Sequence, residues 1–196
     1  MTASRQTRRL GDFIDTLKGF AFKSKWYSEA GTPIVKVSNF TTDSVTCDEL
    51  VCIPEGIAEK YRRYALKHGD VVVQTVGSWP NNPASVVGKA VRIPLKARGA
   101  LLNQNAVKLI PSEDLHQRFF FYLLRSSFFK NYIVGTAQGA ASQASITLAS
   151  IREFRFSLPE PTAQRRIASI LSSYDDLIEN NHSRIRILEE MAQNLY

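Results

Sequence analysis

The sequence predicts an α+β fold: a globular domain with a twisted, mostly antiparallel sheet and a few helices, followed by one long coiled-coil-type helix. Two observations lead to this prediction. Through the first 158 residues, short β-branched or alternating runs are separated by turns that contain glycine or proline. From Thr162 to Tyr196, neither glycine nor proline occurs, and apolar residues recur in heptads. We therefore expect a domain at residues 1–158 and a helical unit at 159–196.

Periodicity and turn residues place the elements of the domain. Ser112 has the side chain of a helix N-cap, and Phe119, Leu123, Leu124 and Phe128 would form the apolar face of the helix after it. Helices are expected at 54–64, 112–132 and 147–153, strands at 33–39, 45–53, 71–76, 84–93, 101–110 and 154–158, and polar loops at 77–83 and 135–145.

The C-terminal heptads define two seam positions on one stripe of a helix. The proposed helix-pairing residues are Ile167, Leu171, Tyr174, Ile178, Asn181, Ile185, Leu188, Ala192 and Leu195. A 3.5-residue repeat of this kind needs a partner helix. Asn181 interrupts one seam, either as a buried asparagine that fixes register or as an exposed break in the stripe. The chain stops within a heptad, which favours a truncated chain.

Charge and cysteine content narrow the function classes. Residues 1–158 carry 21 Lys and Arg against 12 Asp and Glu, a net charge of +9, whereas residues 159–196 carry 4 against 6, a net charge of −2. This asymmetry suggests a polyanion partner for the domain and a protein partner for the helix. Cys47 and Cys52 are expected to be free thiols, which fits a cytoplasmic location. No apolar run is long enough for a membrane span.

The sequence lacks the common signatures of a catalytic or metal site. Its three histidines and two cysteines have no zinc-binding spacing. It contains neither a GxxxxGK[ST] phosphate loop nor a GxGxxG motif after a strand. We therefore expect a non-catalytic protein that binds no metal or cofactor itself.

Polar and basic side chains concentrate instead around loops. A strand-loop-strand finger carries Gln74, Thr75, Ser78, Trp79, Asn81, Asn82 and Ser85, with Lys89 and Arg92 on the returning strand. Amides and hydroxyls can read base edges, and cations can hold phosphates. Taken alone, these residues favour a solvated turn over a base-reading finger, although a tryptophan exposed at the tip of the loop usually has a partner.

Two further groups share this ambiguity. The glycine-rich loop at 135–145 carries Gln138, Ser142 and Gln143. Lys18, Lys23 and Lys25 alternate with aromatic residues near the N-terminus, a pattern that suits a phosphate backbone. An amphipathic edge with snorkelling lysines is the alternative reading of that segment.

Several segments together resemble one family. These are Leu10-Gly11-Asp12, Lys18 to Phe22, Gly31 to Ile34 with Asn39, Gly69 to Val72, and Leu102 to Val107. The most specific segment is Phe154 to Pro161, followed by Gln164-Arg165-Arg166-Ile167-Ala168 and Leu171. In order and spacing they resemble a target recognition domain and the conserved-region helix of Type I restriction-modification specificity subunits.

The resemblance implies a division of labour among subunits. Such a subunit carries two recognition domains, each reading half of a split double-stranded DNA site, on long helices that pair antiparallel and dock the methyltransferase and restriction subunits. S-adenosylmethionine, ATP and Mg would then bind those partners. The present chain would supply one recognition domain and one helix, as an N-terminal half or as a half-subunit that pairs with a second copy. A different class of function is a helix-mediated scaffold whose basic domain does not read DNA.

Overall fold

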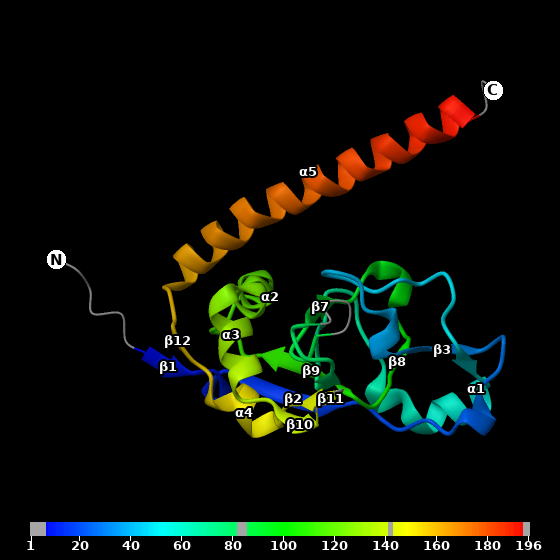
Figure 1. Ribbon diagram of the computed structural model, residues 1–196, viewed down its shortest axis with the longest axis horizontal. Helices are drawn as coiled ribbons and strands as arrows, with labels where there is room; N and C mark the ends of the chain where they lie inside the picture. Colours follow the sequence, from blue (N-terminus) through cyan, green and yellow to red (C-terminus); the bar gives the residue numbers. More distant parts are fainter. Residues whose placement is uncertain (1–6, 82–85, 141–142, 194–196) are drawn as a thin grey trace.

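The computed structural model describes residues 7–81, 86–140 and 143–193 of the 196-residue chain. Figure 1 shows a mixed α/β domain crossed by one long helix, α5 (Pro161–Gln193). The helix starts close to α2 (Gln117–Arg125) and diverges from the domain toward its C-terminal end. The expected α+β fold class with a long C-terminal helix is therefore confirmed.

A four-stranded antiparallel sheet forms the centre of the domain. Its strand order is β2 (Ile14–Lys18), β9 (Ala106–Pro111), β5 (Val71–Gln74) and β7 (Ala90–Arg92). Side chains of β5 alternate between two cores: Val71 and Val73 face α2, α3 and α4, and Val72 joins a second cluster on the other face. Because both faces are covered, the strand reads as a continuous β-branched run.

Smaller sheets surround the central one. β1 (Thr7–Arg9) pairs with β12 (Arg155–Ser157), and β3 (Thr32–Val35) lies between β4 (Cys52–Ile53) and β8 (Leu101–Leu102). The helical turns at α1 (Glu55–Ala58), Glu59–Tyr64 and α4 (Leu148–Glu153) agree with expectation. Cys47 and Cys52 are free, as predicted.

The helix expected at 112–132 is wrong in its bounds and its continuity. The structure has two helices, α2 and α3 (Ser127–Gly135), and α2 begins after His116 instead of Ser112. Ser126 has an extended backbone, and its Oγ accepts a hydrogen bond from the Phe129 amide at 3.2 Å. This capping serine ends one helix and starts the next. The break leaves Phe128 exposed, so it does not belong to the apolar face assigned to it.

Several expected strands are shorter than predicted. Of the range 45–53 only β4 is a strand, and the described part of the range 84–93, from residue 86 on, contributes β7 alone. The range 33–39 narrows to β3, followed by a helical turn at Val37–Asn39. The range 101–110 is divided by a turn in which Asn105 has a φ of 68°. Asparagine tolerates this left-handed conformation, and the turn separates β8 from β9.

The described residues contain neither a membrane-spanning helix nor a metal cluster. In the three described ranges no helix has the combined length and apolar character needed to cross a bilayer. Over the same part of the chain, no three His, Cys, Asp or Glu side chains come together to hold a metal ion.

Candidate nucleic-acid interface

The two polar loops expected from the sequence form a single structure. Within the range 135–145, where a loop was predicted, β10 (Gln138–Ala140) and β11 (Gln143–Ser145) form the two antiparallel strands of a hairpin. β11 then pairs with β6 (Val76–Gly77) of the finger. This cross-strand pairing links two segments more than 60 residues apart, and it places Gln138 and Gln143 on the sheet that carries the finger.

Trp79 fastens the finger to the hairpin. Its indole Nε1 donates a hydrogen bond to the Ala140 carbonyl at 2.8 Å, and the ring packs against the core below the sheet. The expectation of an exposed indole is therefore wrong: Trp79 is partly buried and already has a partner within the chain. A buried tryptophan commonly satisfies its single donor in this way.

The predicted residues differ in their access to solvent. Gln74 and Thr75 are buried, with exposed fractions of 1% and 6%, and hold the base of the finger. The Gln74 Nε2 donates to the Val76 carbonyl at 2.9 Å, and the Thr75 amide donates to the Asn105 carbonyl at 2.7 Å. Asn81, Gln138 and Gln143 are exposed, and Ser78 is half-buried. Asn82, Ser85 and Ser142 lie outside the described residues.

Lys18, Lys23 and Lys25 are exposed beside a cluster of aromatic rings. Phe20, Phe22, Trp26 and Tyr64 all contact the ring of Tyr61 or one another. The Lys23 Nζ lies 5.5 Å from the centre of the Trp26 ring. Positive charge thus lies next to aromatic rings in this segment. That arrangement is compatible both with binding of a phosphate backbone and with an amphipathic edge of snorkelling lysines.

Replacing Trp79 with phenylalanine is expected to loosen the hairpin while the domain stays folded. The ring would still pack, but the Ala140 carbonyl would lose its donor, at a cost of about 1 kcal/mol. Amide hydrogen exchange in residues 76–81 and 138–145 should become about fivefold faster, because the lost hydrogen bond lowers the free energy needed to open this region locally. Trp26→Phe is the matched control, and equal exchange in the two variants would contradict the role assigned to the Trp79 N–H.

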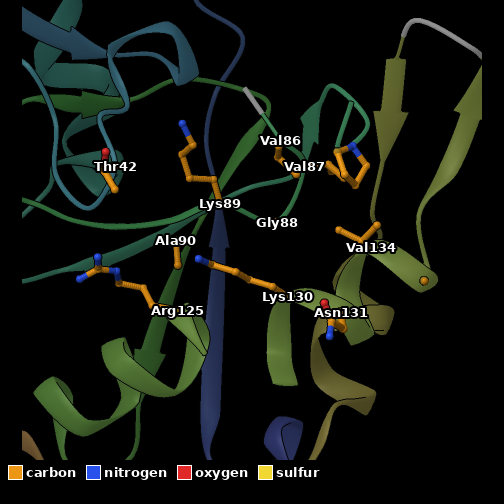
Figure 2. A pocket seen from close by; sticks show the side chains of 12 residues that line it. Thr42, Val86, Val87, Gly88, Lys89, Ala90, Arg125, Lys130, Asn131 and Val134 are labelled. Atoms are coloured by element: carbon orange, nitrogen blue, oxygen red, sulfur yellow. The ribbon is translucent and has the colours of Figure 1, made fainter. Parts of the chain in front are cut away.

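A cleft lies between the finger and α3, and sequence reasoning found only part of it. The cleft has a volume of about 610 Å³, and Figure 2 shows Lys89, Arg125 and Lys130 around it. Lys89 was predicted, but Arg125, Lys130 and Asn131 were not. They lie on α2 and α3, 36 to 42 residues from Lys89 in the chain, so only the tertiary fold brings them together.

Arg92 borders a second groove, between the domain and α5. Its guanidinium carbon lies 5.7 Å from the centre of the Phe121 ring, and Arg125 approaches the same ring at 5.3 Å. Asp175, Asp176 and Glu179 of α5 also line this groove of about 790 Å³. This groove lies at the junction between the helix and the domain, and in it the basic residues of the domain face the carboxylates of α5.

The junction orients α5 through polar side chains. Gln164, Ala168 and Ser172 are the buried residues of the helix. The Tyr122 hydroxyl donates to the Asp175 carboxylate at 2.6 Å. Burial, reinforced by this hydrogen bond, raises the pKa of Tyr122 to about 12. The phenol therefore keeps its proton, and its donor, throughout the neutral range.

The described seam side chains of α5 are not buried against the domain. Tyr174, Ile178, Ile185 and Leu188 have exposed fractions of 62%, 54%, 52% and 63%. Ile167 and Leu171 are 37% exposed, and Asn181 and Ala192 are exposed as well. Leu195 lies outside the described residues. The apolar stripe predicted from the heptads is thus present on the surface of one continuous helix.

Comparison with known proteins agrees with this arrangement. The family model described as Type I restriction modification DNA specificity domain matches residues 4–190. The specificity subunit of the Type I restriction enzyme MjaVIII from Methanocaldococcus jannaschii is 28% identical over 191 residues, covering 95% of this chain and 43% of that protein. The specificity subunit of the EcoAI enzyme from Escherichia coli is 26% identical over 192 residues, covering 94% of this chain and 30% of that protein.

Solved structures show the same fold at low sequence identity. The S subunit of a Type I restriction-modification system from M. genitalium superposes with a TM-score of 0.63 at 18% identity, covering 93% of this chain and 42% of that one. The HsdS subunit from Thermoanaerobacter tengcongensis gives a TM-score of 0.57 at 17% identity, covering 89% and 38%. The chain thus spans less than half the length of these relatives. Because the family model covers nearly the whole sequence, the chain belongs to the Type I restriction modification DNA specificity domain family.

Proposed function

We propose that this chain is the sequence-specific DNA-recognition module of a Type I restriction-modification system and reads one half of a bipartite target. The observation that carries the proposal is the joining of β6 of the finger to the hairpin of β10 and β11 in one sheet, on which the amides of Gln138 and Gln143 and the hydroxyl of Ser145 are exposed. Such groups donate and accept hydrogen bonds together, which suits the base edges in a DNA groove. The basic charge of the domain supplies attraction to the phosphates.

The mechanism would be positioning, without bond-making by this chain. Cations on the domain hold the duplex in register, and exposed side chains such as Asn81, Gln138 and Gln143 select bases. The long helix pairs with the helix of a second recognition half, or of a second copy, and docks the methyltransferase and restriction subunits. S-adenosylmethionine, ATP and Mg belong to those partners in this proposal, and the complex works in the cytoplasm.

The target choice of the finger can be tested in the complete system. Exchanging Asn81 and Asn82 together for alanine is expected to change or abolish the set of methylated sites, because base-reading amides are lost while the buried base of the finger stays intact. Each lost base contact should reduce discrimination by about 1–3 kcal/mol. Mapping methylated positions in cells that carry all subunits measures the outcome directly.

The matched control is Asn180→Ala, an exposed asparagine on α5 away from the finger. It should leave the methylated sites unchanged. If the finger variant also methylates the wild-type sites at the wild-type level, the finger does not select bases. If the wild-type complex binds random and target duplexes equally in a shift assay, the recognition function itself is wrong.

A further inference from the structure

The cleft between the finger and α3 is built from three separate parts of the chain. Its lining comes from the strand that returns from the finger, from the α2–α3 region and from the loop before Val45. The lining residues are Thr42, Pro80, Val86, Val87, Gly88, Lys89, Ala90, Arg125, Lys130, Asn131, Val134 and Gly135. One wall is therefore the flank of the segment that we propose reads bases.

The cleft carries positive charge. Lys89, Arg125 and Lys130 line it, and none of the described residues that line it is acidic. The nearest carboxylate contact is at the rim, where Asp43 lies 3.8 Å from the Arg125 guanidinium. Figure 2 shows the three basic side chains along one hollow, with Thr42 at the side of Lys89. Cations that line the same hollow repel one another, and an anion placed between them is favoured.

Close packing holds the walls of the cleft in place. Gly88 is buried with a φ of 82°, and a Cβ at this position would lie 2.5 Å from the Cγ2 of Ile133 on α3. The turn at Gly88 therefore touches α3 directly. Val87 and Ala90 have exposed fractions of 1% and 3%, so the floor of the cleft is apolar and closely packed. Apolar walls below a ring of cations suit a sugar flanked by phosphates.

The environment of Lys89 also favours an anion. Burial lowers the pKa of its ammonium group, because fewer water molecules solvate the charge. A phosphate oxygen near this ammonium would replace part of the lost solvation. Lys130 on α3 is exposed and can approach the same anion from the opposite wall.

We propose that this cleft binds the sugar–phosphate backbone of the DNA strand next to the bases read by the finger, with Lys89, Arg125 and Lys130 as the phosphate ligands. The inference rests on the proposed DNA-recognition function and adds to it a defined anchor for the strand. A finger that enters a groove places one backbone along its own flank, which is where the cleft opens. Phosphate contacts fix register and orientation but carry no sequence information.

The salt dependence of DNA binding tests the anchor. In the complex with methyltransferase subunits, Lys130→Gln is expected to lower the slope of log affinity against log salt by about 0.9, and Lys89→Gln with Lys130→Gln by about 2. At about 0.1 M salt the double variant should bind target and random duplexes roughly 10- to 100-fold more weakly. Each phosphate contact that is lost reduces the number of counterions released on binding. Lys130→Arg keeps the charge and should keep the slope.

The matched control is Arg155→Gln, which removes one positive charge from the exposed face of β12. Slopes for the Lys130 variants equal to that of Arg155→Gln, in a complex that still prefers its target, would overturn the anchor and leave the recognition function standing. A loss confined to the target duplex would also overturn it, because that result belongs to a base contact. Wild-type binding without any preference for the target would remove the recognition function and the anchor with it.

Discussion

Replacing Gln164 with leucine is expected to lower the free energy of unfolding by about 3 kcal/mol, since up to three polar groups lose their hydrogen-bond partner. The side chain is 1% exposed. Its Nε2 donates to the carbonyls of Asp114 and Pro159, both at 2.9 Å, and its Oε1 accepts from the His116 amide at 2.8 Å. For a chain of this size the melting temperature should fall by roughly 6–12 °C.

The location of Gln164 gives this variant a second consequence. Two of the three hydrogen bonds, to Asp114 and from His116, join the first turn of α5 to the segment at the start of α2, so they set the direction in which the long helix leaves the domain. Gln104→Leu is the matched control, because its side chain is exposed and the change should cost less than about 0.5 kcal/mol. Thermal unfolding followed by circular dichroism compares the two, and equal melting temperatures would contradict the structural role of Gln164.

Local patterns allowed the prediction of some elements because the forces that form them are themselves local. The heptads of α5 and the β-branched run of β5 each reflect a periodic burial pattern within one segment. The helix at 112–132 could not be predicted correctly from periodicity alone. Both halves have helical patterning, and the interruption depends on Ser126 capping α3 with its own side chain. A serine inside an apolar pattern is compatible with either outcome.

The sequence allowed several residues of the candidate interface to be predicted, but not how the fold brings them together. Gln138 and Gln143 were identified as polar loop residues, but the pairing of β11 with β6 depends on residues far apart in the chain. Trp79 illustrates the same limit, since its carbonyl partner at Ala140 is 61 residues away. Arg125 and Lys130 look like ordinary solvated helix residues until α3 is placed beside the finger. The family, that of Type I restriction-modification specificity subunits, was predicted from the ordered set of motifs and is confirmed by the matching family model.

Placing glutamate at both Ile178 and Ile185 is expected to weaken pairing of the long helix by at least roughly 100-fold, or about 3 kcal/mol. Each isoleucine exposes more than half of its surface on the described chain, and burial of that surface against a partner helix would drive association. Glutamate removes the apolar contribution and would bury a charge without a partner. Light scattering after size-exclusion chromatography measures the change, both for the isolated chain and for its assembly with methyltransferase subunits.

The control for the seam adds the same two charges outside it. Ser173→Glu with Asn180→Glu alters two exposed positions on α5 that do not belong to the seam, so pairing should persist. A general effect of negative charge would weaken both variants equally, whereas a seam-specific effect separates them. The fold of the domain should be unaffected in either case, because neither variant changes the buried residues Gln164, Ala168 and Ser172 of α5, or Asp175, which accepts a hydrogen bond from Tyr122. If the seam variant assembles as well as the control, the exposed stripe is not a pairing surface.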